Sequence, residues 1–143
     1  MKYEDLVLLR ETKKTLDTIA EHRRFRFQES LYPATGILSL AAYPKHTEFY
    51  AAGAGFRERG FMAANRIGKT IVGAFECTCH LTGRYPEWWM GRRFKTATQV
   101  GCAGDTSKTV RDIVQLALLG KPGQHGTGMV PKRDLVHEIA KPG

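Results

Sequence analysis

The chain has 143 residues, of which 42% are hydrophobic and 25% are charged, and its formal net charge is +8. This length provides for one domain with a core but not for two ordinary domains, and the hydrophobic content excludes a wholly disordered chain. The positive charge favours a polyanionic partner, such as a nucleotide or a nucleic acid, and a basic chain that is merely soluble is the alternative.

The three cysteines, Cys77, Cys79 and Cys102, are an odd number without the spacing of a disulfide framework, which predicts reduced thiols in the cytoplasm. Cys77, Cys79 and His80 are close in sequence, but their spacing places them on different faces of a helix, so no zinc site is expected. The N-terminus has no signal-peptide pattern, and no apolar run approaches the roughly 18 residues of a membrane span. We therefore expect a cytoplasmic protein without a membrane partner.

Residues 1–31 carry the apolar recurrence of an amphipathic helix or helix pair, which predicts an N-terminal helical segment ahead of a main domain at 32–143. The recurring apolar residues are Leu6, Leu9, Leu16 and Ile19. Residues 22–27 interleave arginine with phenylalanine, a pattern that could contact nucleic acid. Phenylalanines that dock while the arginines stay solvated are the favoured alternative.

Two turn formers, Pro33 and Gly36, predict a break after the first helical segment. Pro44 can then begin a helix that Gly53 ends. This helix lies one element upstream of the loop described next. It is therefore in a position to cover the base of a bound nucleotide.

Residues 63–70 have the spacing of the phosphate-binding loop G-x-x-x-x-G-K-[ST], with Ala63 in the place of the first glycine. A short apolar run at 60–64 precedes the loop and helical apolar recurrence follows it over 71–81, so the predicted order is strand, loop, helix. In such a loop, backbone N–H groups and the positive end of the helix surround phosphate oxygens. A basic turn before a helix, without a nucleotide, is the alternative.

The predicted ATP-binding residues are Ala63, Ala64, Asn65, Arg66, Ile67, Gly68, Lys69 and Thr70. Gly68 lets the backbone approach the anion without a Cβ in the way. Lys69 is expected to contact the outer phosphates, and the Thr70 hydroxyl is expected to bind Mg²⁺. The expected cofactors are therefore ATP and Mg²⁺. Because alanine does not tolerate a strained positive φ, the entry of the loop at Ala63 should be less sharply turned than in a loop that begins with glycine.

Gly83 is expected to end the helix that follows the loop. A loop rich in aromatic and basic residues comes next, at 85–94. Its adjacent Trp88 and Trp89 are predicted to pack over the core, and a stacking platform for bases, beside the arginines of the loop, is the less favoured alternative.

Residues 98–104 read as a second short strand, and a helix with N-cap residues at 105–107 is expected to run to Gly120. A further short helix is expected to begin at Pro131. The alternation of strand and helix predicts an α/β fold with a parallel sheet. Together with the loop, this pattern indicates a partial P-loop NTPase domain with an N-terminal helical extension.

Several stretches closely resemble the N-terminal ATPase part of the large terminase subunit of tailed bacteriophages. They are residues 62–70, 73–76, 80–94, 103–106, 111–112 and 126–131. The resemblance implies an ATP-driven motor that threads viral DNA into a capsid. It further implies that Lys69 and Arg66 are catalytic and that Thr70 holds the metal, with Arg66 stabilising the charge that develops in phosphoryl transfer. A solvated Arg66 without this role is the alternative.

The chain departs from this family at two places. A glutamine upstream of the loop commonly reads the adenine in the family, whereas Lys45 and His46 stand here as the candidate adenine-side residues. No apolar run that ends in Asp-Glu follows the loop, although phosphoryl transfer requires such a motif to hold Mg²⁺ and activate water. The acidic residues that do follow, in expected caps and helices, are Asp105, Asp112, Asp134 and Glu138. Hydrolysis should therefore be very slow.

We expect the chain to be the front piece of a terminase large subunit, truncated before the second acidic motif and the nuclease domain. Its expected function is to bind ATP as the N-terminal portion of a DNA-packaging motor, and the alternative is a truncated prophage remnant that at most binds nucleotide or DNA. A small-molecule kinase is disfavoured, because the sequence shows neither a lid pattern nor a pattern of substrate-binding arginines. The resemblance implies double-stranded DNA, the portal and the small terminase subunit as partners, and a homo-oligomer only for the full-length protein.

Overall fold

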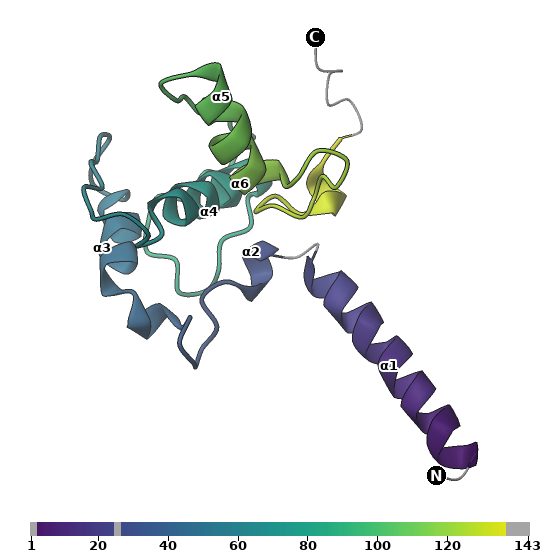
Figure 1. Ribbon diagram of the computed structural model, residues 1–143. Coiled ribbons are helices and arrows are strands. Elements are labelled where there is room, and N and C mark those ends of the chain that lie inside the picture. Colours follow the sequence, from purple (N-terminus) through teal and green to yellow (C-terminus); the bar gives the residue numbers. More distant parts are fainter. Residues whose placement is uncertain (1–2, 25–26, 137–143) are drawn as a thin grey trace.

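The computed structural model describes residues 3–24 and 27–136 of the chain. Its elements are α1 (Tyr3–Arg24), α2 (Phe27–Ser30), the 3₁₀ turn η1 (Leu40–Ala42), α3 (Pro44–Ala52), α4 (Lys69–Thr82), α5 (Ser107–Thr109), the π-helical η2 (Val110–Gln115), α6 (Leu116–Leu119) and the 3₁₀ turn η3 (Lys132–Asp134). The elements α5, η2 and α6 follow one another without a break and form a single helical run. In Figure 1 this run and α3 lie around α4, while α1 extends away from the other helices.

The described residues contain no β-strand, so the predicted parallel sheet, and with it the α/β P-loop NTPase fold class, is wrong. The two segments read as strands, 60–64 and 98–104, belong to no helix, and no backbone hydrogen bond between described residues joins them. An extended segment becomes a strand only when a neighbour completes its ladder of hydrogen bonds. The apolar run that suggested the first strand is not a buried one, because Met62 is 97% exposed.

Helix α4 is the central element of the core. It begins after Gly68, whose φ of +88° is in the left-handed region, and ends before Gly83, whose φ is +68°, so the predicted end of the helix is confirmed. One face of α4 is buried, and its members are Val72, Ala74, Phe75, Glu76, Thr78 and Cys79. Both α6 and η2 contact this helix, which therefore carries the core of the described chain.

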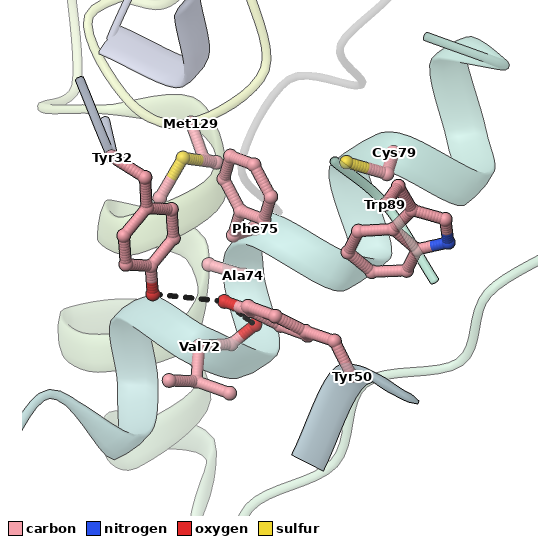
Figure 2. Packing of buried hydrophobic residues seen from close by; sticks show 8 residues of the cluster. All are labelled: Tyr32, Tyr50, Val72, Ala74, Phe75, Cys79, Trp89 and Met129. Atoms are coloured by element: carbon pink, nitrogen blue, oxygen red, sulfur yellow. Dashed lines mark hydrogen bonds between the residues drawn. The ribbon is translucent and has the colours of Figure 1, made fainter. Parts of the chain in front are cut away.

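The core is rich in aromatic rings from separate segments. Phe75 of α4 stacks on Trp88 with the ring centroids 5.8 Å apart and the planes at 9°, and Trp89 lies 4.9 Å from the Tyr50 ring. Figure 2 shows Tyr32, Tyr50, Phe75 and Trp89 gathered around α4, with Met129 beside Phe75. Pairs in such arrangements contribute about 1 kcal/mol each beyond their buried area. The predicted packing of the two tryptophans over the core is confirmed.

The predicted boundaries of two further helices are confirmed. Helix α3 has Pro44 in its first turn and Gly53 at its C-terminal end. The helical run that starts with α5 is capped by the Thr106 hydroxyl, which accepts from the backbone N–H of Thr109 at 3.1 Å, and it ends at Gly120. Short capping contacts of this kind depend on neighbouring residues, which is why the sequence pattern locates them.

Helix α1 exposes every side chain that is described for it, residues 5–21, and so contributes nothing to the core. The predicted arginine–phenylalanine stretch at 22–27 lies outside the described side chains except for Phe27, which packs against the core. The division into domains at residues 31 and 32 stays a prediction. None of the described helices combines the length and the apolar character that crossing a membrane requires.

Candidate phosphate-binding site

The loop at residues 63–70 leads directly into α4 and is turned sharply at two points. Arg66 has a φ of +65° and Gly68 a φ of +88°. For a residue with a Cβ, such as Arg66, the left-handed conformation costs about 1 kcal/mol or more, so the surrounding contacts must hold it. Ala63 does not have a positive φ, which agrees with the expectation that the loop is not sharply turned at its first residue.

Lys69 is the first residue of α4, and its side chain folds back over the loop. The ammonium Nζ donates to the carbonyl oxygens of Ala63 at 2.6 Å and of Ala64 at 2.7 Å. Because an ammonium has three N–H groups, two of them close the loop and one is left for another acceptor. The lysine therefore places its charge over the loop instead of directing it into solvent.

The first turn of α4 has the electrostatic character of an anion site. It contains no acidic residue, and its N-cap, Gly68, has no side chain that could accept from the first N–H groups. Those N–H groups have no acceptor within the helix, and the helix dipole adds partial positive charge at this end. With the Lys69 ammonium at the same place, the arrangement favours a bound anion such as a phosphate.

The other predicted ATP-binding residues are accessible to a ligand. Ala64, Asn65, Arg66, Ile67 and Thr70 are exposed, whereas Ala63, Gly68 and Lys69 are half-buried. Thr70, in the first turn of α4, carries the only hydroxyl of the loop residues. The structure thus brings the predicted residues together as one short loop at a helix N-terminus.

The two candidate adenine-side residues have different surroundings. Lys45 is exposed and donates to the Glu48 carboxylate at 2.7 Å. His46 is only 6% exposed, and its Nε2 lies 3.0 Å from the carbonyl oxygen of Ile67 in the loop. Its Nδ1 lies 2.8 Å from the hydroxyl of Tyr32. Both ring nitrogens of His46 therefore have partners, and one of them belongs to the loop backbone.

Tyr32 was not identified as a site residue from the sequence, where it stands only beside a turn-forming proline. Its hydroxyl bonds to His46 and lies 3.0 Å from the hydroxyl of Tyr50. Figure 2 shows the Tyr32 and Tyr50 hydroxyls meeting next to the backbone of Val72 in α4. No local sequence signal identifies this contact, because it joins residues from separate segments.

Three of the predicted acidic residues that follow the loop are hydrogen-bonded to neighbouring side chains. Asp134 accepts two hydrogen bonds from the Arg84 guanidinium at 2.6 Å each. The hydrogen bond from Arg111 lowers the pKa of Asp112, and a hydrogen bond from Thr109 lowers the pKa of Asp105. The fourth predicted acid, at position 138, lies outside the described residues.

A cavity of about 380 Å³ lies beside the loop, between α4 and the helical run that ends in α6. Its lining includes Lys69 and Thr70 together with Cys77 and Cys102. Burial raises the pKa of the Cys77 thiol to about 12, with smaller contributions from Cys102. The rest of the cavity lining is largely apolar, so the cavity offers a ligand mainly apolar contacts and few hydrogen bonds.

The cysteines and the histidine near the end of α4 contact different parts of the molecule. Cys77 lines the cavity, Cys79 accepts from the Gln28 amide in the core, and His80 lies 3.0 Å from the Tyr85 hydroxyl. Within the described ranges, no three histidine, cysteine, aspartate or glutamate side chains gather as a metal site would require.

Comparison with known proteins places the loop inside a recognised sequence family. Residues 60–142, more than half of the chain, match the family described as terminase large subunit, T4likevirus-type, N-terminal. The chain is 34% identical to the terminase large subunit of Salmonella phage P22, over 85% of this chain and 26% of the relative. It therefore spans about a quarter of the length of the curated relative that it matches. No solved structure matches the chain significantly.

Proposed function

The chain belongs to the terminase large-subunit family, and from this premise we propose that it is the ATP-binding N-terminal portion of a phage DNA-packaging motor. In the full-length protein, ATP hydrolysis drives the movement of double-stranded DNA. The portal and the small terminase subunit are the proposed protein partners of that complete protein, which acts as a homo-oligomer.

The observation that carries the proposal is the position of the Lys69 ammonium. It bonds to two carbonyl oxygens of the loop and lies at the N-terminus of α4, where no acidic residue is present in the first turn. A fixed cation, free first-turn N–H groups and a helix dipole act in the same direction on an anion. This combination supports a phosphate ligand in particular, because phosphate oxygens accept several hydrogen bonds at once.

Three side chains have proposed roles toward the nucleotide. Lys69 contacts the outer phosphates, Thr70 provides a hydroxyl ligand for Mg²⁺, and Arg66 provides a positive charge at the exposed turn of the loop. Mg²⁺, when bound, neutralises phosphate charge during transfer. The half-buried lysine and the exposed threonine and arginine are compatible with these roles.

A titration with a fluorescent ATP analogue tests the proposal. Wild-type protein should bind the analogue with Mg²⁺ and more weakly without it, and Lys69→Ala should lose about tenfold or more in affinity, as expected when a charged hydrogen-bond donor is removed. Lys121→Ala is the control, since Lys121 is an exposed lysine outside the phosphate-loop residues, in the segment that follows α6. Equal affinities of wild type and Lys69→Ala would contradict the proposal.

One observation favours a second candidate, a non-catalytic remnant that at most binds nucleotide or DNA. Three of the carboxylates that follow the loop already bond to Arg84, Arg111 and Thr109. Without a carboxylate to orient the attacking water, turnover by this chain should be undetectable. A phosphate-release assay measures the turnover, which should be undetectable for both candidates. A robust rate that Thr70→Ala abolishes would contradict the remnant and show that another residue of the chain acts as the acidic catalyst.

A further inference from the structure

His46 is held in one orientation by contacts on all sides of its ring. Its plane stacks on Tyr43 with the centroids 4.9 Å apart, and the Phe61 ring meets it edge-on at 5.9 Å. Its two nitrogens bond to the Ile67 carbonyl oxygen and to the Tyr32 hydroxyl. A ring so fixed cannot turn outward to a base without losing both hydrogen bonds.

The partners determine which ring nitrogen carries the proton. A carbonyl oxygen can only accept, so Nε2 of His46 is protonated and donates to Ile67. In the neutral ring, Nδ1 then accepts from the Tyr32 hydroxyl, and the Tyr32 oxygen in turn accepts from Tyr50. The loop carbonyl is thereby connected to the aromatic core through one directed series of hydrogen bonds.

The His46 ring also fixes the orientation of the peptide bond between Ile67 and Gly68. A Cβ added to Gly68 would lie 3.2 Å from Cε1 of His46, so the ring is packed against this glycine. The peptide bond between Ile67 and Gly68 is trans and planar, hence its C=O and N–H point in opposite directions. Because His46 holds the C=O, it also directs the Gly68 N–H away from α3.

We propose that His46 is a positioning residue of the phosphate loop, which orients the Gly68 N–H by holding the Ile67 carbonyl, and that it does not read the base. This inference rests on the proposed function, in which the N–H groups of the loop surround a phosphate. It replaces the expected adenine-side role of His46 by a role toward the phosphate chain. The effect of His46 is accordingly the same for every ligand that carries the phosphates.

Three ligands that share a chain of three phosphates test this directly, because two of them differ in the base and the third has neither base nor ribose. Mg-ATP, Mg-GTP and inorganic tripolyphosphate with Mg²⁺ are titrated calorimetrically into wild type, His46→Ala and His46→Gln. His46→Ala should weaken all three by the same factor, about tenfold, as for a lost hydrogen bond that positions a ligand contact. His46→Gln keeps an amide N–H donor and should restore most of the affinity. A loss confined to ATP, with tripolyphosphate binding unchanged, would overturn the proposal.

Two variants separate this effect from general damage to the fold. Tyr32→Phe removes the partner of Nδ1 and leaves the Nε2 donor, so it should weaken the three ligands equally but less than His46→Ala. Glu58→Ala, an exposed change in the segment between α3 and the loop, should leave all three affinities unchanged. A Tyr32→Phe variant that weakens ATP alone would count against the proposal.

Amide hydrogen exchange provides a readout without any ligand. The backbone N–H of Val72 donates to the Gly68 carbonyl oxygen at 2.9 Å and reports on the start of α4. In His46→Ala this amide should exchange faster, and in His46→Gln the wild-type rate should return. Unchanged exchange in His46→Ala would refute the positioning role. If wild type binds none of the three ligands, the proposed function fails while the exchange comparison still decides the role of His46.

Discussion

The Arg59 guanidinium donates to the Glu76 carboxylate, with Nη2 and Oε1 2.9 Å apart, and through Nη1 to the carbonyl oxygen of Phe49 at 2.7 Å. The guanidinium also lies over the Phe49 ring, 4.5 Å from its centroid. The two side chains of the ion pair are 19% and 10% exposed. Arg59 therefore joins α3 to α4 just before the chain enters the candidate loop at 63–70.

Arg59→Ala should lower the free energy of unfolding by about 3 kcal/mol, because it leaves the Glu76 carboxylate buried without its main partner. The remaining neighbour, Nε2 of His80, is 3.6 Å away. Urea unfolding measures the difference, with Arg57→Ala as the control at an exposed arginine of the same segment. A loss as small as that of the control would show that Glu76 remains solvated.

Gly91 and Gly73 should respond oppositely to substitution by alanine. A Cβ at Gly91 would lie 2.5 Å from the Tyr50 carbonyl oxygen, so Gly91→Ala must shift the backbone and should cost about 2 kcal/mol. Gly73 lies within α4 with open space around its Cα, so Gly73→Ala should stabilise the protein by about 0.5–1 kcal/mol through helix propensity. Thermal unfolding of both variants checks the signs. Two changes of the same sign would contradict the packing at Gly91.

Local signals explain how much of the fold the sequence predicts. The ends of α3 and α4 follow from Pro44, Gly53 and Gly83, whose backbone preferences act within one turn of the helix. The predicted sheet had no such support, because strand pairing depends on distant residues and a short apolar run does not distinguish a strand from a connecting segment. The strand predicted at 60–64 is therefore a connecting segment without regular secondary structure.

The candidate site shows the same division between local and distant contacts. The loop at 63–70 is predicted from its spacing, because the residues of the phosphate-binding pattern are contiguous in the chain, and its role toward phosphate stays a proposal. The partners of His46 are not predictable in this way, because Ile67 is 21 residues away and Tyr32 is 14 residues away. The adenine-side role expected for His46 followed from its position upstream of the loop, whereas the surroundings of its ring are defined by contacts that only the structure shows.

The protein should lose stability in alkaline solution, and the buried thiols contribute to this loss. Burial raises the pKa of both Cys77 and Cys79 to about 12 from an ordinary value of 9.0. Because the folded state favours the protonated thiol, this stabilisation is complete below pH 9 and is lost as the pH rises towards 12. Burial also raises the pKa of Tyr32 and Tyr50, which adds to the effect.

Urea unfolding at a series of pH values between 8 and about 11 measures this dependence. The wild type should lose stability progressively above about pH 9, and Cys77→Ala should show a shallower decline from its own starting value. A decline of equal slope in both proteins would show that the Cys77 thiol titrates alike in the folded and unfolded states.

Thr78 and Thr82 provide a matched pair of hydroxyls on α4. Thr78 is fully buried, and its Oγ1 has no hydrogen-bond partner among the described residues. Thr82, one helical turn later, donates through Oγ1 to the Thr78 carbonyl oxygen at 2.7 Å and accepts from the Arg84 N–H at 3.3 Å. Valine has nearly the shape of threonine without the hydroxyl, so the two replacements differ mainly in the hydrogen bonds that they remove.

Thr78→Val should raise the free energy of unfolding by about 1 kcal/mol, because it removes a buried polar atom that pairs with nothing in the described chain. Thr82→Val should lower it by about 1 kcal/mol, because it removes two hydrogen bonds at the end of α4. Parallel urea titrations of the two variants and wild type measure both signs in one experiment. If Thr78→Val instead destabilises the protein as much as Thr82→Val does, then the Thr78 hydroxyl has a partner and the packing around the centre of α4 differs from the arrangement described.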